Sequence, residues 1–497
     1  MNRRDFLRSL GFGAVAMAVP GFAARGERAA TAPRKSEKLN FVFFLIDDMG
    51  WKDLGCYGST FYETPNIDRL AGEGMRFTDA YAACPVCSPT RASIVAGKYP
   101  ARLGITQWIG GPNEPTPYRH YLPLEELTIA EALKQAGYAT GFVGKWHLST
   151  RDPDRAKYYP DRQGFDENIG GDYSGAPPTY FWPYEKRGRN LETMPPGGAD
   201  GEYLTDRLTD ESLKFLEVNK NRPFLLYLSH YAVHTPIESK QALTDEYKAK
   251  AEKLPKTDGP RFVPVYSRYK TRQVQDNPAY AGMVQSVDES VGRVMNKLVE
   301  LGVADNTAVI FMSDNGGLST VAREAPTCNL PLRAGKGWLY EGGIREPMII
   351  KWPGVVRPGS LCSEPVTSTD FYPTMLQMAG LPLKPKQHVD GVSLVPLLRG
   401  KRKLKRQAIY WHYPHYHGSG NKPSGAVRAG DYKLIEWYGD NSVELYNLKN
   451  DIGEKDDLAV KMPVKAAELR RMLHRWLRQM KAKVPTPEQL RQFNKKA

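Results

Sequence analysis

Hydrophobic runs that alternate with amphipathic stretches predict an α/β fold for most of the chain. Short continuous apolar runs, ended by polar or turn residues, are typical of strands buried on both faces of a parallel sheet. Such runs fall at residues 39–46, 140–143, 224–228, 307–312 and 348–351. Helices are expected between them, at residues 89–96, 125–136, 203–218, 279–301 and 368–379. This alternation favours a central sheet with helices packed against it.

The pattern changes after a basic run at residues 401–406, which is typical of a solvated linker. Short strands separated by turns are expected beyond it, at residues 409–411, 426–428, 432–435 and 444–446. A basic amphipathic helix follows at about residues 464–482. Before the linker, residues 152–202 predict long loops rich in Gly, Pro and Tyr, and residues 238–278 a Lys-rich polar insertion. We therefore divide the chain into residues 1–32, 38–403 and 404–497.

The first part, residues 1–32, predicts a targeting segment and linker. Paired arginines, Arg3 and Arg4, stand before Phe6-Leu7, and a moderately apolar run follows from Gly11 to Ala24. This run is too short for a comfortable membrane span. A disordered basic tail is the alternative, but the paired arginines favour a twin-arginine signal peptide. The expected partner is then the twin-arginine translocase, and the expected location is the periplasm or the exterior, without stable membrane insertion after cleavage.

Composition predicts a soluble globular protein with an anionic partner. The 497 residues are 41% hydrophobic and 25% charged, and the formal net charge is +14. The basic residues are scattered and no nucleic-acid motif is present, so we expect no nucleic-acid partner, whereas a sulfated polymer fits the charge. The five cysteines are too few and uneven for a disulfide framework; they are Cys56, Cys84, Cys87, Cys328 and Cys362.

Polar residues stand at or just beyond the ends of four predicted strands. They are Asp47, Asp48, Lys145, His147, His230, His234, Asp314 and Asn315. The carboxyl edge of an open α/β sheet is where sites form. Any one of these groups alone is explained equally well by a cap or a turn, but four coincidences favour a site. Three carboxylates and an amide oxygen are hard ligands, which suit Ca²⁺ or Mg²⁺ and not zinc.

The histidines and lysines each have an ordinary structural explanation as well. A lone loop histidine explains His147 or His234, a packing role explains His230, and a solvated turn explains Lys336. Two histidines and two lysines near the carboxylates nevertheless suit a site that handles an oxyanion.

One further segment carries a family resemblance. Cys87-Ser88-Pro89-Thr90-Arg91, followed by Gly97-Lys98, resembles the signature of the type I sulfatases, in which the cysteine is oxidised to formylglycine. A thioredoxin-like Cys-x-x-Cys lacks the Ser-Pro-Thr-Arg that follows here. Other matching pieces extend the resemblance from Leu39 to about Leu458. They include Asp47-Asp48, Gly144-Lys145-Trp146-His147, His234, Ser313-Asp314-Asn315-Gly316, Gly335-Lys336-Gly337 and Glu444-Leu445-Tyr446-Asn447-Leu448.

The resemblance implies an alkaline-phosphatase-like fold, with a large mixed, mostly parallel sheet in residues 38–403 and an antiparallel sheet in a C-terminal α+β domain. It implies a sulfuric ester hydrolase whose nucleophile is a hydrated aldehyde, made from Cys87 by a formylglycine-generating enzyme. Metal ligands would be Asp47, Asp48, Asp314, Asn315 and residue 87 itself.

The resemblance also implies roles for the remaining candidate residues. Arg91 would position the formylglycine hydroxyl, and Lys145 and Lys336 would bind the sulfuryl oxygens. His234 would be the general acid for the leaving alcohol, and His147 the base that helps to expel sulfate.

The substrate expected from the resemblance is a sulfated carbohydrate, with galactose or N-acetylgalactosamine 4-sulfate indicated, and export suggests polysaccharide degradation. We expect a loop at residues 412–428 to reach the main site, with His415 and Arg428 as substrate contacts. One alternative is a formylglycine-dependent phosphonate monoester hydrolase or phosphodiesterase. A second is a non-catalytic polysaccharide-binding protein on a sulfatase fold.

Overall fold

The computed structural model describes residues 38–255, 259–266 and 268–496, so the predicted signal peptide lies outside the described residues. The first described strand is β1 (Asn40–Ile46), and its burial on both faces explains why the residues after Asn40 are all apolar. Phe41, Phe43 and Leu45 enter the hydrophobic core on one face of the sheet, and the alternate residues of the strand enter the core on the other face. A strand buried on both faces has no polar side, as the sequence pattern predicts.

The sheet around β1 is large and mixed. Its strands are, in spatial order, β11 (Ser360–Cys362), β2 (Met75–Tyr81), β10 (Arg345–Lys351), β8 (Thr307–Ser313), β1, β5 (Phe224–His230), β3 (Ala139–Gly144) and β4 (Glu167–Ile169), with β12 (Val366–Thr367) beside β2. The strands from β8 to β4 are parallel, whereas β10 is antiparallel to both of its neighbours. The prediction of a mostly parallel mixed sheet is confirmed.

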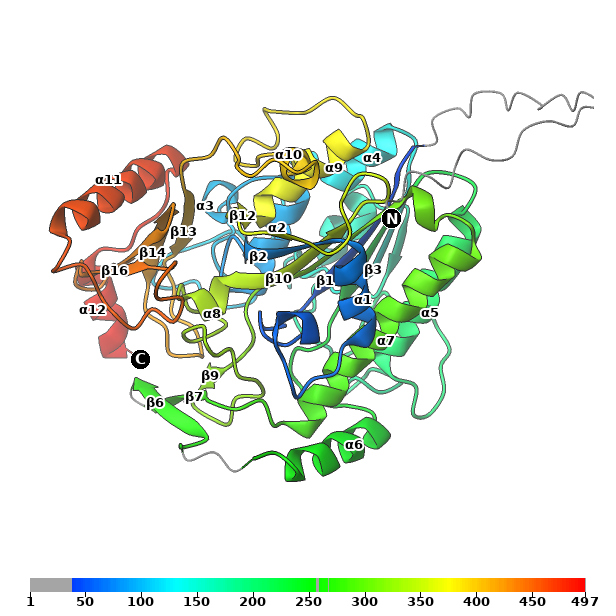
Figure 1. The fold of residues 1–497 in the computed structure, drawn as a ribbon, viewed down its shortest axis with the longest axis horizontal. Helices are drawn as coiled ribbons and strands as arrows, with labels where there is room; N and C mark the ends of the chain where they lie inside the picture. Colours follow the sequence, from blue (N-terminus) through cyan, green and yellow to red (C-terminus); the bar gives the residue numbers. More distant parts are fainter. Residues whose placement is uncertain (1–37, 256–258, 267, 497) are drawn as a thin grey trace, which may run out of the picture. The chain divides into compact units, whose positions relative to one another are not determined.

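Helices cover both faces of this sheet (Figure 1). One face carries α1 (Pro65–Glu73), α5 (Leu204–Asn219) and α7 (Pro278–Glu300), with α6 (Gln241–Glu252) packed on α7. The other face carries α2 (Cys87–Ala96), α4 (Ile129–Gln135), α9 (Phe371–Met378) and α10 (Val395–Leu398). The short helices α3 (Pro100–Leu103) and α8 (Glu341–Ile344) lie in connecting segments. Among the described residues, no helix combines the length and the apolar character that crossing a membrane requires.

Several parts of the fold were not expected from the sequence, among them β4, which lies within the predicted loops of residues 152–202. Strand β2 has the sequence Met-Arg-Phe-Thr-Asp-Ala-Tyr, and its mixed polarity does not match the continuous apolar runs by which the other strands were predicted. The polar insertion contains α6 and a hairpin of β6 (Phe262–Tyr266) and β7 (Tyr269–Arg272), which pairs with β9 (Thr320–Val321) in a small sheet. Neither face of this small sheet enters the main cores, and Val263 and Val265 of β6 are exposed.

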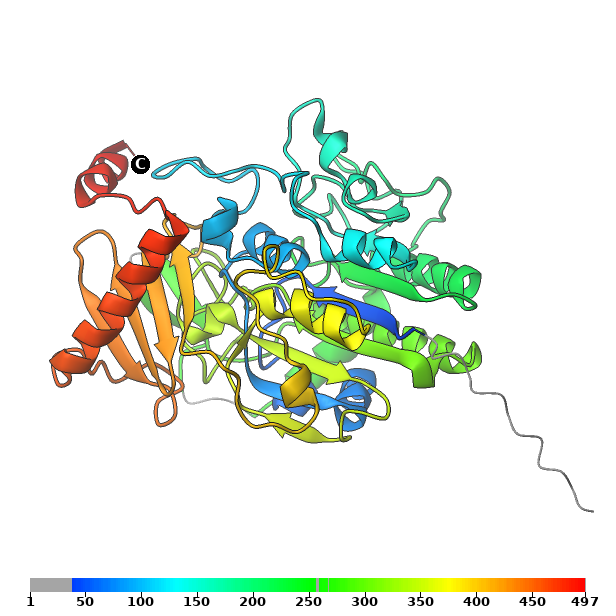
Figure 2. The same cartoon turned by 90° about the horizontal axis from the view of Figure 1, so that it is seen from above.

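The C-terminal part forms an antiparallel sheet, as predicted. Its strands are β13 (Ile409–Tyr413), β14 (Ser424–Ala429), β15 (Tyr432–Trp437) and β16 (Val443–Asn447), in that order. Helix α11 (Pro463–Met480) covers one face, and α12 (Pro487–Lys496) ends the described chain. Figure 2 shows α11 lying across this sheet. The other face packs against Val86, Trp338 and Tyr340 of the larger part, so the second sheet backs the segment that carries Cys87.

Buried ion pairs join the two sheets. Lys433 on β15 is fully buried, and its Nζ lies 2.9 Å from a carboxylate oxygen of Glu341 and 2.9 Å from one of Glu454. Glu454 in turn accepts a hydrogen bond from the backbone N–H of Glu341 at 2.7 Å. Because Glu341 begins α8 and Lys433 belongs to the C-terminal sheet, this triad fixes the position of one against the other.

Lys433→Met should therefore destabilise the protein strongly. It leaves the buried Glu454 without its cation and Glu341 with Arg345 as its remaining cation, which costs about 3 kcal/mol or more in the free energy of unfolding. Guanidinium denaturation measures the change, and the exposed lysine variant Lys449→Met should stay within about 0.5 kcal/mol of the parent. Equal stability of the two variants would show that the triad does not hold the sheets together.

Candidate active site

Four neighbouring parallel strands deliver the predicted polar residues to one edge of the large sheet. The order β8, β1, β5, β3 places the ends of these strands side by side, with Ile46 of β1 paired in register with Ser313 of β8 and His230 of β5. Residues just past these ends therefore converge, as the sequence pattern suggests. The edge is buried: Asp47, Lys145 and Asp314 are fully buried.

Each carboxylate of the cluster has a cationic partner. Lys145 Nζ lies 2.6 Å from Asp47 Oδ2, and Lys336 Nζ lies 2.6 Å from Asp48 Oδ1. Arg91 donates from Nε to Asp314 Oδ2 at 2.8 Å. Buried charges are stable only when they are paired in this way. The site is thus a set of alternating negative and positive groups shielded from water.

Cys87 is the first residue of α2, and its sulfur lies within this charged set. Lys336 Nζ is 3.4 Å from Cys87 Sγ. Arg91 stands four residues later on the same helix, so both side chains project from one face. Burial raises the pKa of the Cys87 thiol to about 12, even though Lys145 and Lys336 oppose the rise. An unmodified thiol here would be protonated at neutral pH and a weak nucleophile.

The two aspartates that flank the site have pKa values shifted in opposite directions. Burial alone would raise the pKa of Asp48, but Lys336, His234 and Lys145 outweigh it and hold that pKa well below its usual range. Burial and the nearby charge of Asp47 raise the pKa of Asp314 to about 6, against the effect of Arg91. The surroundings thus favour the charged form of Asp48 and disfavour the charged form of Asp314.

The arrangement fits a divalent cation. Ligand atoms of Asp47, Asp48, Cys87 and His234 all lie within 4.8 Å of one another. Asp47 Oδ1 and Asn315 Oδ1 are buried and have no hydrogen-bond partner. Orphaned buried oxygens are costly unless something binds them, and oxygen ligands are those that Ca²⁺ and Mg²⁺ prefer. Asp47, Asp48 and residue 87, with the orphaned oxygen of Asn315, are therefore the residues that would hold the ion, and the role of Asp314 as a ligand stays a prediction.

His147 lies in the loop after β3, in a position fixed on two sides. Its Nε2 lies 2.9 Å from the carbonyl oxygen of Ile109, so Nε2 carries the proton. Its backbone N–H donates to Asp172, which belongs to the long loop 152–202. The other ring nitrogen, Nδ1, is buried without a partner. Burial and Lys145 hold the pKa of His147 well below its usual range, so the neutral ring offers Nδ1 as a base.

His234 follows β5 and faces Asp48. Its Nδ1 donates to the carbonyl oxygen of Thr235 at 2.8 Å, and its Nε2 lies 3.7 Å from Asp48 Oδ2. The side chain is 17% exposed, more than that of Asp48. Burial and the charge of Lys336 lower the pKa of His234 to about 3, with Asp48 opposing them. His234 thus stands at the boundary between the buried charges and the surface.

The sequence did not single out His417, which lies next to Lys336. A Cβ at Gly337 would meet His417 Nδ1 at 2.5 Å, so only glycine allows this approach. Burial, then Lys336, lowers the pKa of His417 to about 3. The backbone N–H of Ser419 donates to His417 Nδ1, which leaves Nε2–H as a donor. The loop after β13 does reach the site, but the histidine that arrives there is His417, and the run of three histidines gives no signal that distinguishes it.

Three other predicted residues have partners outside the cluster. His415 is buried, with Nε2 2.9 Å from Thr106 Oγ1. Arg428 is buried in an ion pair with Asp79 at 2.8 Å. His230 is fully buried against Ser290, which favours the packing role. His415 is thus bonded to Thr106 and Arg428 is paired with Asp79, in contrast to the substrate contacts expected from the sequence.

Comparison with known proteins agrees with this geometry. The family model described as Sulfatase matches residues 39–381, and the model described as N-sulphoglucosamine sulphohydrolase, C-terminal, matches residues 334–483. A sulfatase of Formosa agariphila is 32% identical, covering 91% of this chain and 90% of its own. The N-acetylgalactosamine-6-sulfatase of Rattus norvegicus is 34% identical, covering 86% of this chain and 76% of its own. The crystal structure of Ps i-CgsB, also solved in complex with k-i-k-neocarrahexaose, has a TM-score of 0.72 at 31% identity, covering 88% and 93% of the two chains.

The fold and the cluster of charged side chains around Cys87 define a hydrolase of the alkaline-phosphatase-like type. The chain belongs to the sulfatase family, and it is a sulfuric ester hydrolase.

Proposed function

We propose that this enzyme hydrolyses sulfate esters of a sulfated saccharide, with formylglycine formed from Cys87 as the nucleophile and with Ca²⁺ or Mg²⁺ at the carboxylate cluster. The observation that carries the proposal is the position of Cys87, whose sulfur lies 3.4 Å from Lys336 Nζ inside a buried set of carboxylates and cations. A neutral thiol is not stabilised by such an environment. A sulfate ester undergoing attack is stabilised by the cations, which the carboxylates hold in place.

The modified residue and the ion each supply one part of the chemistry. Once oxidised and hydrated, residue 87 supplies a hydroxyl nucleophile and a second hydroxyl whose deprotonation releases sulfate, which serine or cysteine cannot do. A divalent cation supplies positive charge beside the sulfuryl oxygens and favours loss of the nucleophile's proton.

The chain's own residues hold the substrate and move the protons. Lys145 and Lys336 bind the sulfuryl oxygens, and Arg91 orients the hydroxyl of residue 87. His147 takes a proton at Nδ1, since its Nε2–H is held by Ile109. His234 gives a proton to the leaving sugar oxygen. The negative charge of a bound sulfate beside Lys336 offsets the cation that lowers the pKa of His234, and so prepares it to donate.

Similarity to enzymes that act on sulfated sugars supports a saccharide substrate. The relatives include N-acetylgalactosamine-6-sulfatases, and Ps i-CgsB has been solved in complex with k-i-k-neocarrahexaose. We propose a galactose-type sugar on this basis. The 4-sulfate predicted from the sequence and the 6-sulfate in the relatives' names are separated by assaying N-acetylgalactosamine 4-sulfate beside the 6-sulfate.

We further propose that the enzyme is exported by the twin-arginine translocase and matured by a formylglycine-generating enzyme. The paired Arg3 and Arg4 support the export route, and the Cys87-Ser88-Pro89-Thr90-Arg91 motif supports maturation. Because twin-arginine export carries folded proteins, both oxidation of Cys87 and metal loading can precede it.

Protein purified from its native host tests the proposal. Peptide mass spectrometry around Cys87 should show an aldehyde that a hydrazide traps, and the protein should release sulfate from sulfated sugars. Phosphonate monoester and phosphodiester substrates, assayed beside them, should turn over more slowly per molecule of enzyme. A free thiol with no sulfate release would contradict the proposal, and faster phosphonate hydrolysis would favour the phosphonate monoester hydrolase.

His234→Gln tests the general acid. The variant should lose about 10²–10⁴-fold in kcat on a sulfated sugar, whose alkoxide needs a proton to leave. It should lose far less on 4-nitrophenyl sulfate, because nitrophenolate leaves unprotonated. The matched variant His230→Gln, at the buried histidine bonded to Ser290, should keep the parent's ratio of the two rates. Equal losses on both substrates would assign His234 to binding instead of proton donation.

A further inference from the structure

We propose that a pocket beside the active site binds a second anionic group of the substrate, so that the enzyme acts on saccharides carrying at least two negative charges. This inference rests on the proposed function, because the pocket is interpreted as part of the same binding site. The pocket has a volume of about 1070 Å³. That is large enough for a sugar unit and its substituents.

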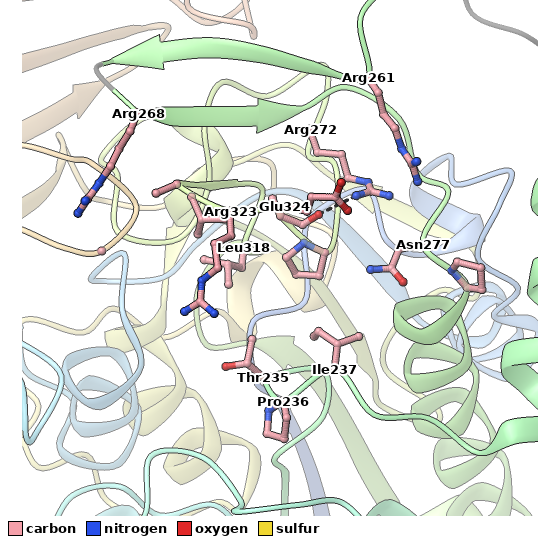
Figure 3. A pocket seen from close by; sticks show the side chains of 16 residues that line it. Thr235, Pro236, Ile237, Arg261, Arg268, Arg272, Asn277, Leu318, Arg323 and Glu324 are labelled. Carbon is pink, nitrogen blue, oxygen red and sulfur yellow. Dashed lines mark hydrogen bonds between the residues drawn. The ribbon is translucent and has the colours of Figure 1, made fainter.

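Three of the residues that line the pocket directly follow residues of the site. Thr235 follows His234, and Gly418 follows His417. Leu318 follows Gly317, whose carbonyl oxygen accepts the backbone N–H of Lys336 at 3.2 Å. If the sulfate of a saccharide lies between Lys336 and Lys145, the neighbouring part of the saccharide therefore enters this pocket. Figure 3 shows the pocket with Thr235, Pro236 and Ile237 at its base.

The pocket is lined by an excess of positive charge. Four arginines and one glutamate contribute to it: Arg261, Arg268, Arg272, Arg323 and Glu324. Asp276 neutralises part of this charge, since it pairs with Arg261 at 2.8 Å and with Arg272 at 2.5 Å. Arg272 also donates to the carbonyl oxygen of Ala325, which fixes it in the wall. These two arginines are structural parts of the pocket.

Arg268 and Arg323 are different. Both are exposed, and within the described ranges neither has a carboxylate within 4.0 Å. Arg268 stands at the start of β7 beside the ring of Tyr269, and Arg323 follows β9 in the same small sheet. In Figure 3 the Arg323 guanidinium extends toward the side of the pocket formed by Thr235. Guanidinium groups form paired hydrogen bonds with sulfate-like and carboxylate oxygens, so these two are the ones free to bind an anion.

This arrangement gives the polar insertion a role. The strands β6 and β7 and the residues beside them supply Arg261, Arg268 and Arg272, while the segment after β9 supplies Arg323. The pairing of β7 with β9 holds these two sources beside each other. The chemistry recognised is a sulfate or a carboxylate on a neighbouring sugar, and a substrate with a single sulfate leaves this part of the site unused.

Binding to the nucleophile-free variant Cys87→Ala tests the inference without requiring turnover. Calorimetry would use three galactose-based oligosaccharides of equal length, which carry one sulfate, two sulfates, or one sulfate and one carboxylate. Adding Arg268→Ala and Arg323→Ala should weaken binding of the doubly charged probes about tenfold or more and leave the singly charged probe unchanged. The two doubly charged probes show whether sulfate or carboxylate is preferred.

The control removes two exposed arginines from a different pocket. Arg357→Ala with Arg402→Ala, in the same Cys87→Ala background, should alter none of the three affinities. Equal weakening of all probes by the Arg268 and Arg323 changes, or no weakening at all, would overturn the second anionic site. Failure of the matured parent enzyme to release sulfate would count against the proposed function alone, because the binding comparison does not depend on it.

Discussion

Cys87→Ala should abolish sulfate release, lowering kcat by about 10⁴-fold or more. The variant keeps Lys145, Lys336 and Arg91, which are held by carboxylates and not by the sulfur. It therefore still binds a sulfated sugar but has no group that can attack sulfur. Cys87→Ser should also be nearly inactive toward repeated turnover, because a serine ester lacks the second hydroxyl through which sulfate is expelled.

Sulfate release measured by ion chromatography, together with binding of the same sugar, separates the two effects. Cys84→Ala is the matched control, since Cys84 is equally buried in the same segment and has no contact with Lys336 among the described residues. It should retain the parent's activity. Activity of Cys87→Ala close to that of the parent would mean that another group is the nucleophile.

The charged edge of the sheet could be predicted from the sequence because neighbouring parallel strands end at the same edge, whatever the conformation of the loops. Asp47 and Asp314 each follow a strong apolar run and Lys145 follows a shorter one, so the strand ends could be located and their neighbours expected at one edge. Cys87 was identified differently, through a motif of local spacing. Both kinds of signal lie within a few residues of the chain and do not depend on distant packing.

The positions that could not be predicted depend on packing between distant segments. His417 reaches Lys336 only because Gly337 has no side chain and the C-terminal sheet packs on Trp338. The choice of His417 over His415 is made by contacts of the folded loop, and nothing in the run of histidines encodes it. The arginine-lined pocket is a similar case, since it combines an insertion and a loop separated by about fifty residues in the chain.

The predictions that differ from the structure also concern residues whose positions depend on packing between distant segments. Arg428 was expected at the substrate because it follows the histidine-rich loop, but it lies on a strand whose inner face is committed to the ion pair with Asp79. Strand β2 was missed because Arg76 and Asp79 interrupt its apolar pattern, although these polar residues are paired or half-buried in the folded sheet. Residues that form tertiary ion pairs can thus interrupt the apolar pattern by which a strand is recognised. They can also engage a residue that the sequence pattern assigns to function.

Removal of the divalent cation should lower kcat by on the order of 10³-fold, because the charge it supplies beside the sulfuryl oxygens contributes several kcal/mol to the transition state. Treatment with a chelator followed by dialysis should produce this loss, and Ca²⁺ or Mg²⁺ should reverse it. The same addition should raise the Tm, since an ion that binds only the folded protein adds about 2.7 kcal/mol of stability at a concentration 100 times its Kd.

Asn315→Ala tests whether the cluster at the sheet edge is the binding site. The substitution removes the orphaned Oδ1 while Asp47, Asp48 and Asp314 keep their cationic partners. We expect it to shrink the Tm increase caused by the ion and to raise the concentration of ion needed for half-maximal activity at least about tenfold. Asn219→Ala, at a fully buried amide on α5, loses comparable hydrogen bonds and should leave the response to the ion unchanged. If both variants respond to the ion as the parent does, then Asn315 is not a ligand. If chelation of the parent changes neither Tm nor kcat, the orphaned oxygens of Asp47 and Asn315 bind some group other than a metal.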